Sequence, residues 1–155
     1  MPKKVIIILL FICAWLGWKF MMNQKSNLLM SDHQIVTAQL ANQTFHFEAV
    51  TTPPSIAQGL SDRKEIGSDG MLFILATTRI PTFWMKNMLF DLDMVWIANG
   101  KVVDITRQVA KPSPGMTESE LPLISPSQPV NMVLEIPSGQ ADAWQIEIGQ
   151  SIIFP

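Results

Sequence analysis

Short stretches of apolar residues, separated by polar, glycine-rich or proline-rich segments, follow one another from residue 35 to the end of the chain. Residues 35–40 and 44–50 alternate between apolar and polar positions, as half-buried β-strands do, and residues 41–43 can turn the first strand into the second. More continuous apolar stretches predict further strands at residues 71–75, 83–86, 89–98, 101–108, 130–136 and 151–154. So many short strands predict a mainly β domain, either a small barrel-like domain or a sandwich.

One or two short helices are expected between these strands. Residues 52–54 read Thr-Pro-Pro, which is typical of a helix start, and this helix should end near Gly59. Ser138 is expected to cap a second short helix that runs to Trp144.

The clearest local signal in the chain is the pair Asn99-Gly100. Both residues tolerate a positive φ, as a type I′ hairpin turn requires, so we expect a tight hairpin with positive φ at Gly100. Residues 111–129 carry many prolines and should form a long irregular loop, of the kind that often covers or builds a functional site.

The first residues have the pattern of an export signal, with Lys3 and Lys4 followed by an apolar stretch at residues 5–18 and then Lys19. No cleavage site of small residues follows. We therefore expect a hydrophobic helix that stays in the membrane as a signal-anchor, with a cleaved signal peptide as the alternative. The predicted division is residues 1–24 as signal-anchor or signal peptide, 25–34 as tether and 35–155 as a single β-rich domain.

Charge is distributed unevenly between these parts. All 13 acidic residues lie after Met30 together with 7 of the 11 basic ones, which leaves that part with a net charge of 7 − 13 = −6. The basic N-terminus favours a single-pass protein of the cytoplasmic membrane with its domain in the periplasm, or a secreted domain if the signal is cleaved. An acidic domain without a basic run argues against nucleic acid as a partner. Cys13 is the only cysteine, so the domain has neither a disulfide nor a thiol nucleophile.

Residues 82–97 are the best place to look for a site. This stretch is apolar and bulky, yet it contains Lys86, Asn87, Asp91 and Asp93. A charge in such surroundings must be paired or must line a wet cleft, because an unpaired buried ion is too costly. We therefore expect Lys86 to be mostly buried, within salt-bridge reach of Asp91, Asp93 or Glu135.

Several short motifs occur in one order that resembles the domain of unknown function 192 family. They are Gly59-Leu60-Ser61-Asp62-Arg63, Gly70-Met71-Leu72-Phe73, Phe83-Trp84-Met85-Lys86-Asn87, Leu92-Asp93, Asn99-Gly100-Lys101-Val102-Val103 and Val133-Leu134-Glu135. The resemblance implies a compact β-rich fold, often behind an export signal, and no agreed activity. The chain departs from the family pattern at Met88, Asp91, Ile124 and Gln150, where Thr, Pro, Tyr and Asp are usual.

Six residues are candidates for a ligand site: Arg63, Trp84, Lys86, Asn87, Asp93 and Glu135. They can line a cleft for a polar ligand with Trp84 as its apolar wall, or the charged ones can form a buried ion-pair network. We favour a non-catalytic binding or interaction module whose partner is a small polar ligand or an envelope protein, with no cofactor and no assigned metal or catalytic residue.

Two alternatives remain open. One is a cell-envelope enzyme that uses Lys86 with an acidic partner. The other is copper binding by the thioethers of Met85 and Met88, although methionines in an apolar stretch are more often core residues. His46 and Glu48 share a strand face and can begin a metal site, but no third ligand is identifiable.

Overall fold

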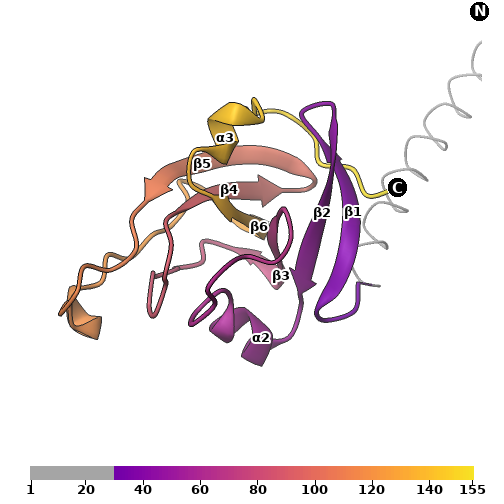
Figure 1. Ribbon diagram of the computed structural model, residues 1–155. Coiled ribbons are helices and arrows are strands. Elements are labelled where there is room, and N and C mark those ends of the chain that lie inside the picture. The colour runs from indigo at the N-terminus through magenta and orange to yellow at the C-terminus, as the bar shows by residue number, and fades with distance from the viewer. Residues whose placement is uncertain (1–29) are drawn as a thin grey trace, which may run out of the picture. The chain divides into compact units, whose positions relative to one another are not determined.

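The computed structural model describes residues 30–155, which fold around one six-stranded β-sheet (Figure 1). The sheet has the order β1-β2-β3-β6-β4-β5. Its strands are β1 (Gln34–Leu40), β2 (Gln43–Val50), β3 (Gly70–Arg79), β4 (Leu92–Ala98), β5 (Lys101–Val109) and β6 (Val130–Pro137). Two short helices, α2 (Pro53–Gln58) and α3 (Gln140–Ala143), and a single 3-10 turn, η1 (Glu118–Glu120), accompany them. The predicted mainly β class and the two short helices are confirmed.

The predicted hydrophobic helix at residues 1–24 lies outside the described residues. Within residues 30–155, no helix has the length and apolar character needed to cross a membrane.

Local turn signals set the connections between neighbouring strands. The β4–β5 hairpin turns at Asn99 and Gly100, with φ of 51° and 74°, so the predicted tight turn is confirmed. β2 and β3 run parallel, and parallel strands need a crossover, which α2 provides. Helix α2 begins where the Thr-Pro-Pro signal placed it: Thr52 is its N-cap and accepts a hydrogen bond from the backbone N–H of Ser55.

The fold is mainly β, but the expectation of a barrel-like domain or a sandwich is wrong. The structure has one sheet that is not closed. The chain end comes near to closing it, because Ile153 bonds to Gln39 of β1 while Ser151 bridges Lys101 of β5, at the two opposite edges. These are isolated bridges, so the predicted strand at residues 151–154 is reduced to two contacts.

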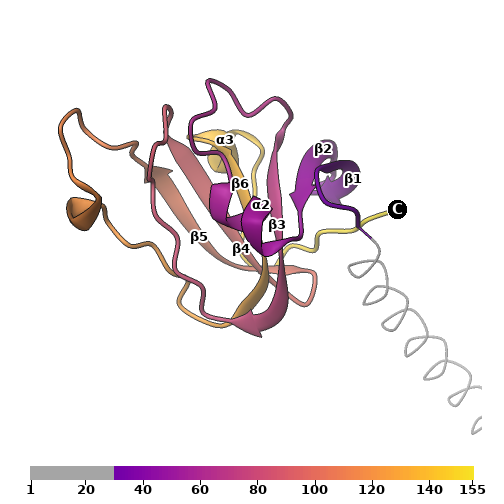
Figure 2. The same cartoon turned by 90° about the horizontal axis from the view of Figure 1, so that it is seen from below.

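Other element boundaries also differ from the prediction, and the strand expected at residues 89–98 begins only at Leu92. Residues 83–86 are not a strand: Phe83 makes one bridge to Ile124, and the rest of residues 80–91 is irregular. Helix α3 is capped by Gly139 in a left-handed conformation rather than by Ser138. Residues 110–129 form the expected irregular loop, which projects away from the sheet in both Figure 1 and Figure 2.

The core on one face of the sheet is built around Trp96, which is fully buried. Its indole N–H donates to the hydroxyl of Thr106 at 2.9 Å, so the one polar atom of the ring is satisfied. Phe83 packs edge-to-face against both Trp96 and Phe73, with ring centroids 5.7 Å and 5.2 Å away. This aromatic stack joins the 80–91 segment to the sheet without hydrogen-bonding it as a strand, and two of its members, Phe73 and Phe83, line a pocket.

A buried glutamate in an aromatic pocket

Glu135 lies in the middle of the sheet, on β6, between Met71 of β3 and Met94 of β4. Only 5% of the residue is exposed. Among residues 30–155, its carboxyl group has no hydrogen-bond or ion-pair partner, which is unusual for a buried carboxyl group. Burial without a partner raises the pKa of Glu135 from 4.5 to about 8, because the charged form is poorly solvated there.

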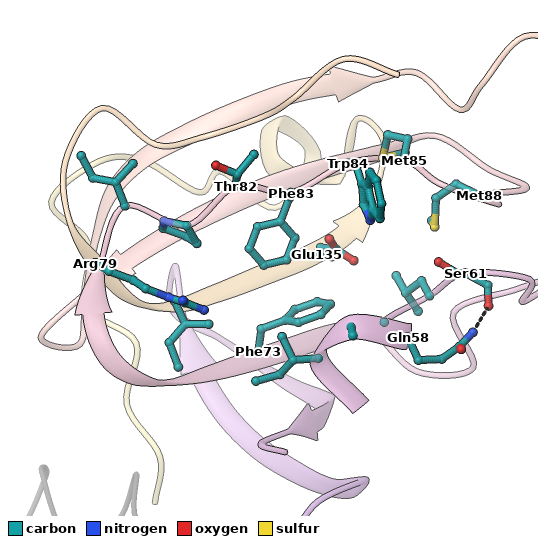
Figure 3. Close-up of a pocket in the computed structure, with 17 residues that line it drawn as sticks. Gln58, Ser61, Phe73, Arg79, Thr82, Phe83, Trp84, Met85, Met88 and Glu135 are labelled. Atoms are coloured by element: carbon teal, nitrogen blue, oxygen red, sulfur yellow. Dashed lines mark hydrogen bonds between the residues drawn. The ribbon is translucent and has the colours of Figure 1, made fainter. Parts of the chain in front are cut away.

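The carboxyl group opens into a pocket of about 390 Å³ (Figure 3). One wall is α2 with the segment that follows it, a second is β3, and a third is the irregular segment that begins after β3. The lining residues are Ile56, Ala57, Gln58, Gly59, Leu60, Ser61, Phe73, Leu75, Arg79, Ile80, Pro81, Thr82, Phe83, Trp84, Met85, Met88 and Glu135. Most of these residues are apolar or aromatic, but the polar ones, among them Gln58, Arg79 and Glu135, make the polar share of the pocket surface as large as the apolar share. Ligand sites commonly combine apolar walls with a few polar groups in this way.

The segment that covers Glu135 is held at several points. Phe83 exchanges two backbone hydrogen bonds with Ile124, at 2.8 and 2.9 Å. The hydroxyl of Ser61 donates to the backbone carbonyl of Lys86 at 2.8 Å, and the next residue, Asn87, has a φ of 56° that turns the chain back. Trp84 remains 42% exposed at the rim, so its ring borders both the pocket and the solvent.

The electrostatics of the pocket depend on two groups. Besides Glu135, Arg79 is the one charged residue among those that line it, and Figure 3 shows Arg79 at the side opposite Trp84. Below a pH of about 8 the buried carboxyl group is neutral and can donate a hydrogen bond; above that pH, or beside a cation, it is a carboxylate.

The prediction for Lys86 is wrong on both counts. Its side chain is 39% exposed and pairs with Glu118 at 2.7 Å, rather than with Asp91, Asp93 or Glu135. Its ammonium group also lies 5.1 Å from the ring centroid of Trp84. The reason is that the 83–86 segment is not a strand, so Lys86 turns toward the 110–129 loop. There it lines, with Glu118, a neighbouring groove that shares Met88 with the pocket.

Asp93 is buried, as expected for a charge within an apolar strand, but it serves the fold. Its two carboxylate oxygens accept hydrogen bonds from the backbone N–H groups of Gln108 at 2.8 Å and Ala141 at 2.9 Å. It is on the strand next to Glu135, yet it does not line the pocket.

Arg63 and Asn87 are also separate from the pocket. Arg63 forms a two-pronged ion pair with Glu48, at 2.6 and 2.8 Å, and this partner lowers the pKa of the Glu48 carboxyl group. Asn87 donates to Asp62 at 3.3 Å near the surface. Of the six candidate residues, only Trp84 and Glu135 line this pocket. Lys86 contacts the Trp84 ring from outside it.

The other residues of the pocket were not identified from the sequence. Phe73 and Phe83 occur in the motifs of the family resemblance, which was the one available signal for them. Ser61 also occurs in one of these motifs, whereas Gln58 and Arg79 carried no signal, because their position in the pocket depends on how distant segments pack. As for metals, no group of three or more His, Cys, Asp or Glu side chains in residues 30–155 is placed to hold an ion.

This arrangement defines a small, mainly β domain with an aromatic pocket over a partnerless buried carboxyl group. The chain belongs to the domain of unknown function 192 family, described as "Uncharacterized ACR", whose model matches residues 34–154. The resemblance seen in the motifs is confirmed.

Two crystal structures are similar to this chain. One is a "putative transcription regulator" from Sinorhizobium meliloti 1021, at 26% identity and a TM-score of 0.69 over 81% of this chain and 97% of that one. The other is a protein of unknown function from Novosphingobium aromaticivorans DSM 12444, at 26% identity and a TM-score of 0.69 over 81% of this chain and 89% of that one. No curated protein matches the chain.

Proposed function

We propose that this chain is a membrane-tethered, extracytoplasmic binding module whose ligand site is the pocket over Glu135. The observation that carries the proposal is the carboxyl group of Glu135, which is 5% exposed and opens into the pocket without a partner in residues 30–155. An unsatisfied buried carboxyl group destabilises a fold, and such groups gather at functional sites. A ligand that hydrogen-bonds to this carboxyl group, or pairs with its charge, would remove that cost of burial.

Binding is favoured over catalysis by the position of Lys86. The catalytic alternative relied on this lysine as a desolvated reactive amine. Instead, Lys86 is partly exposed, pairs with Glu118 and lines a different groove. The residues after Met30 have a net charge of 7 − 13 = −6, which disfavours binding to DNA and favours a small ligand. This charge argues against carrying over to this chain the description of the similar Sinorhizobium protein as a transcription regulator.

A fragment screen read at methionine methyl groups tests the binding site. Met85 and Met88 line the pocket, although Met88 also lines the Lys86 groove, and Met132 is buried outside both. The full chain labelled with ¹³C at its methionine methyls therefore carries a specific probe, Met85, and a control, Met132. Fragments that bind should shift the Met85 and Met88 signals and leave the Met132 signal in place. Trp84→Ala should weaken these fragments, because it removes the rim. Fragment hits that leave the Met85 signal in place would contradict the proposed site, even if they shift Met88, which also lines the Lys86 groove.

The tether requires a separate test. Alkaline phosphatase fused after Pro155 folds into an active enzyme only outside the cytoplasm, so we expect an active fusion that fractionates with the membrane. The motive is the Lys3-Lys4 start ahead of the apolar stretch at residues 5–18. A soluble exported fusion that lacks residues 1–24 would favour the cleaved signal instead. An inactive fusion beside an active cytoplasmic reporter would rule out export.

A further inference from the structure

The groups nearest to Glu135 suit a positive charge. Three aromatic side chains, Phe73, Phe83 and Trp84, line the same pocket as the carboxyl group, together with the thioethers of Met85 and Met88 (Figure 3). Aromatic faces attract cations, and a carboxylate beside them supplies the counter-charge. The chain already shows this combination at the rim, where Lys86 lies 5.1 Å from the Trp84 ring centroid and pairs with Glu118.

No basic side chain of residues 30–155 already fills this role. Arg79 is the other charged residue of the lining. In the sheet its backbone lies opposite Val130 of β6, and Glu135 lies five residues further along that strand. Five residues of a strand span about 16 Å, so the two charged residues belong to opposite ends of the pocket. They form no ion pair.

We propose that the pocket binds an organic ammonium group carried on a short apolar chain, with the Glu135 carboxylate as its counter-ion and the aromatic side chains around its stem. This inference rests on the proposed function, because it names the class of ligand for the same pocket. The guanidinium of Arg79 at the other end also suits ligands that carry a carboxylate at the far end of the chain.

Binding of an ammonium group is coupled to release of a proton. The empty pocket holds Glu135 in its neutral form near pH 7, since burial raises its pKa to about 8. When the cation enters, the carboxyl O–H bond breaks, its proton goes to the solvent and the carboxylate stays with the ammonium ion, so charge is conserved.

The side chains that face Glu135 from the neighbouring elements are uncharged, so none of them shifts its protonation. β3 presents Met71 and Phe73, β4 presents Met94, and the segment after α2 presents Ser61. The covering segment presents Trp84 and Met85. The one charged group among the lining residues besides Glu135 is Arg79, at the far end of β3.

Titration of the full chain in mild detergent with n-butylammonium, butan-1-ol and butanoate tests the inference, again read at the Met85 and Met88 methyl groups. The three probes share a chain and differ in their polar end. The affinity for n-butylammonium should rise about tenfold per pH unit between pH 6 and 7 and level off near pH 8. The affinity for butan-1-ol should not change with pH, and butanoate should bind most weakly.

Glu135→Gln provides the matched control, because an amide has nearly the shape of the neutral carboxyl group and should leave the fold intact. This variant should bind n-butylammonium at least about tenfold more weakly, without the pH slope, and should retain butan-1-ol. The pH slope of the wild-type chain is a second measurement that does not depend on any variant.

Equal affinities for butan-1-ol and n-butylammonium at pH 8 would overturn the ammonium inference and leave the binding pocket in place. A preference for butanoate would overturn it as well and would point to Arg79. Failure of n-butylammonium to bind also overturns it. In that case the fragment screen still decides, on its own, whether the pocket binds ligands at all.

Discussion

Raising the pH from about 5 to about 8 should lower the free energy of unfolding of the ligand-free protein by on the order of 3–5 kcal/mol. The cause is Glu135, whose pKa rises from 4.5 in the open chain to about 8 in the folded protein. Between these values the folded state holds a proton that the unfolded state has lost, so each step up in pH favours unfolding. The contribution of Glu135 is complete below pH 4.5 and lost above about pH 8.

Urea denaturation at several pH values and constant ionic strength measures this slope. The carboxyl groups of Asp32, Glu48 and Asp104 act in the opposite direction, because hydrogen bonds and ion pairs lower their pKa values. Their effects belong to more acid conditions than those in which Glu135 titrates. His33 forms an ion pair with Glu48, at 2.8 Å, only when it is protonated, so the Glu135→Gln variant is needed to separate the contribution of Glu135. Glu135→Gln should flatten the slope, and Glu135→Leu should be more stable than the wild-type protein at pH 8. A Glu135→Gln variant that keeps the full slope would show that another group is responsible.

The parts of the fold that were predicted correctly depend on local chemistry. The Asn99-Gly100 turn and the start of α2 at Thr52 are fixed by residues within a few positions of one another, which a linear sequence displays. The strand at 83–86 was wrong because Phe83 and Met85 are apolar for a different reason: they cover the pocket and the core from outside the sheet. Apolar character reports burial and does not by itself report strand geometry.

The candidate site was predicted only in part for a similar reason. Glu135 was a candidate because it lies in the Val133-Leu134-Glu135 motif of the family resemblance and could neutralise Lys86. That pairing was inferred from charge alone, without knowledge of how the segments pack. The actual partner of Lys86, Glu118, comes from the 110–129 loop, whose path depends on contacts between distant segments. Likewise, the positions of Gln58 and Arg79 follow from the packing of α2 on β3, which no local pattern encodes.

Asp93 is expected to be the most sensitive of the carboxylates that hold the fold together. It is 1% exposed, and its oxygens accept from the backbone N–H groups of Gln108 at 2.8 Å and Ala141 at 2.9 Å. Gln108 has a φ of 55° beside a register shift between β4 and β5, and Ala141 lies in the first turn of α3, so one side chain fixes both an irregular strand and a helix start.

Asp93→Ala should therefore lower the free energy of unfolding by about 2–5 kcal/mol, because it leaves two backbone donors without their acceptor in a buried place. Asp91→Ala is the matched control: Asp91 is exposed and accepts one hydrogen bond, from the N–H of Lys111 at 2.8 Å, so its loss should cost less than about 1 kcal/mol. Urea denaturation of the two variants gives the comparison. Equal losses would refute the structural role of Asp93. Because Asp93 does not line the pocket, folded Asp93→Ala should keep the Met85 methyl response to ligands, whereas Trp84→Ala should weaken that response.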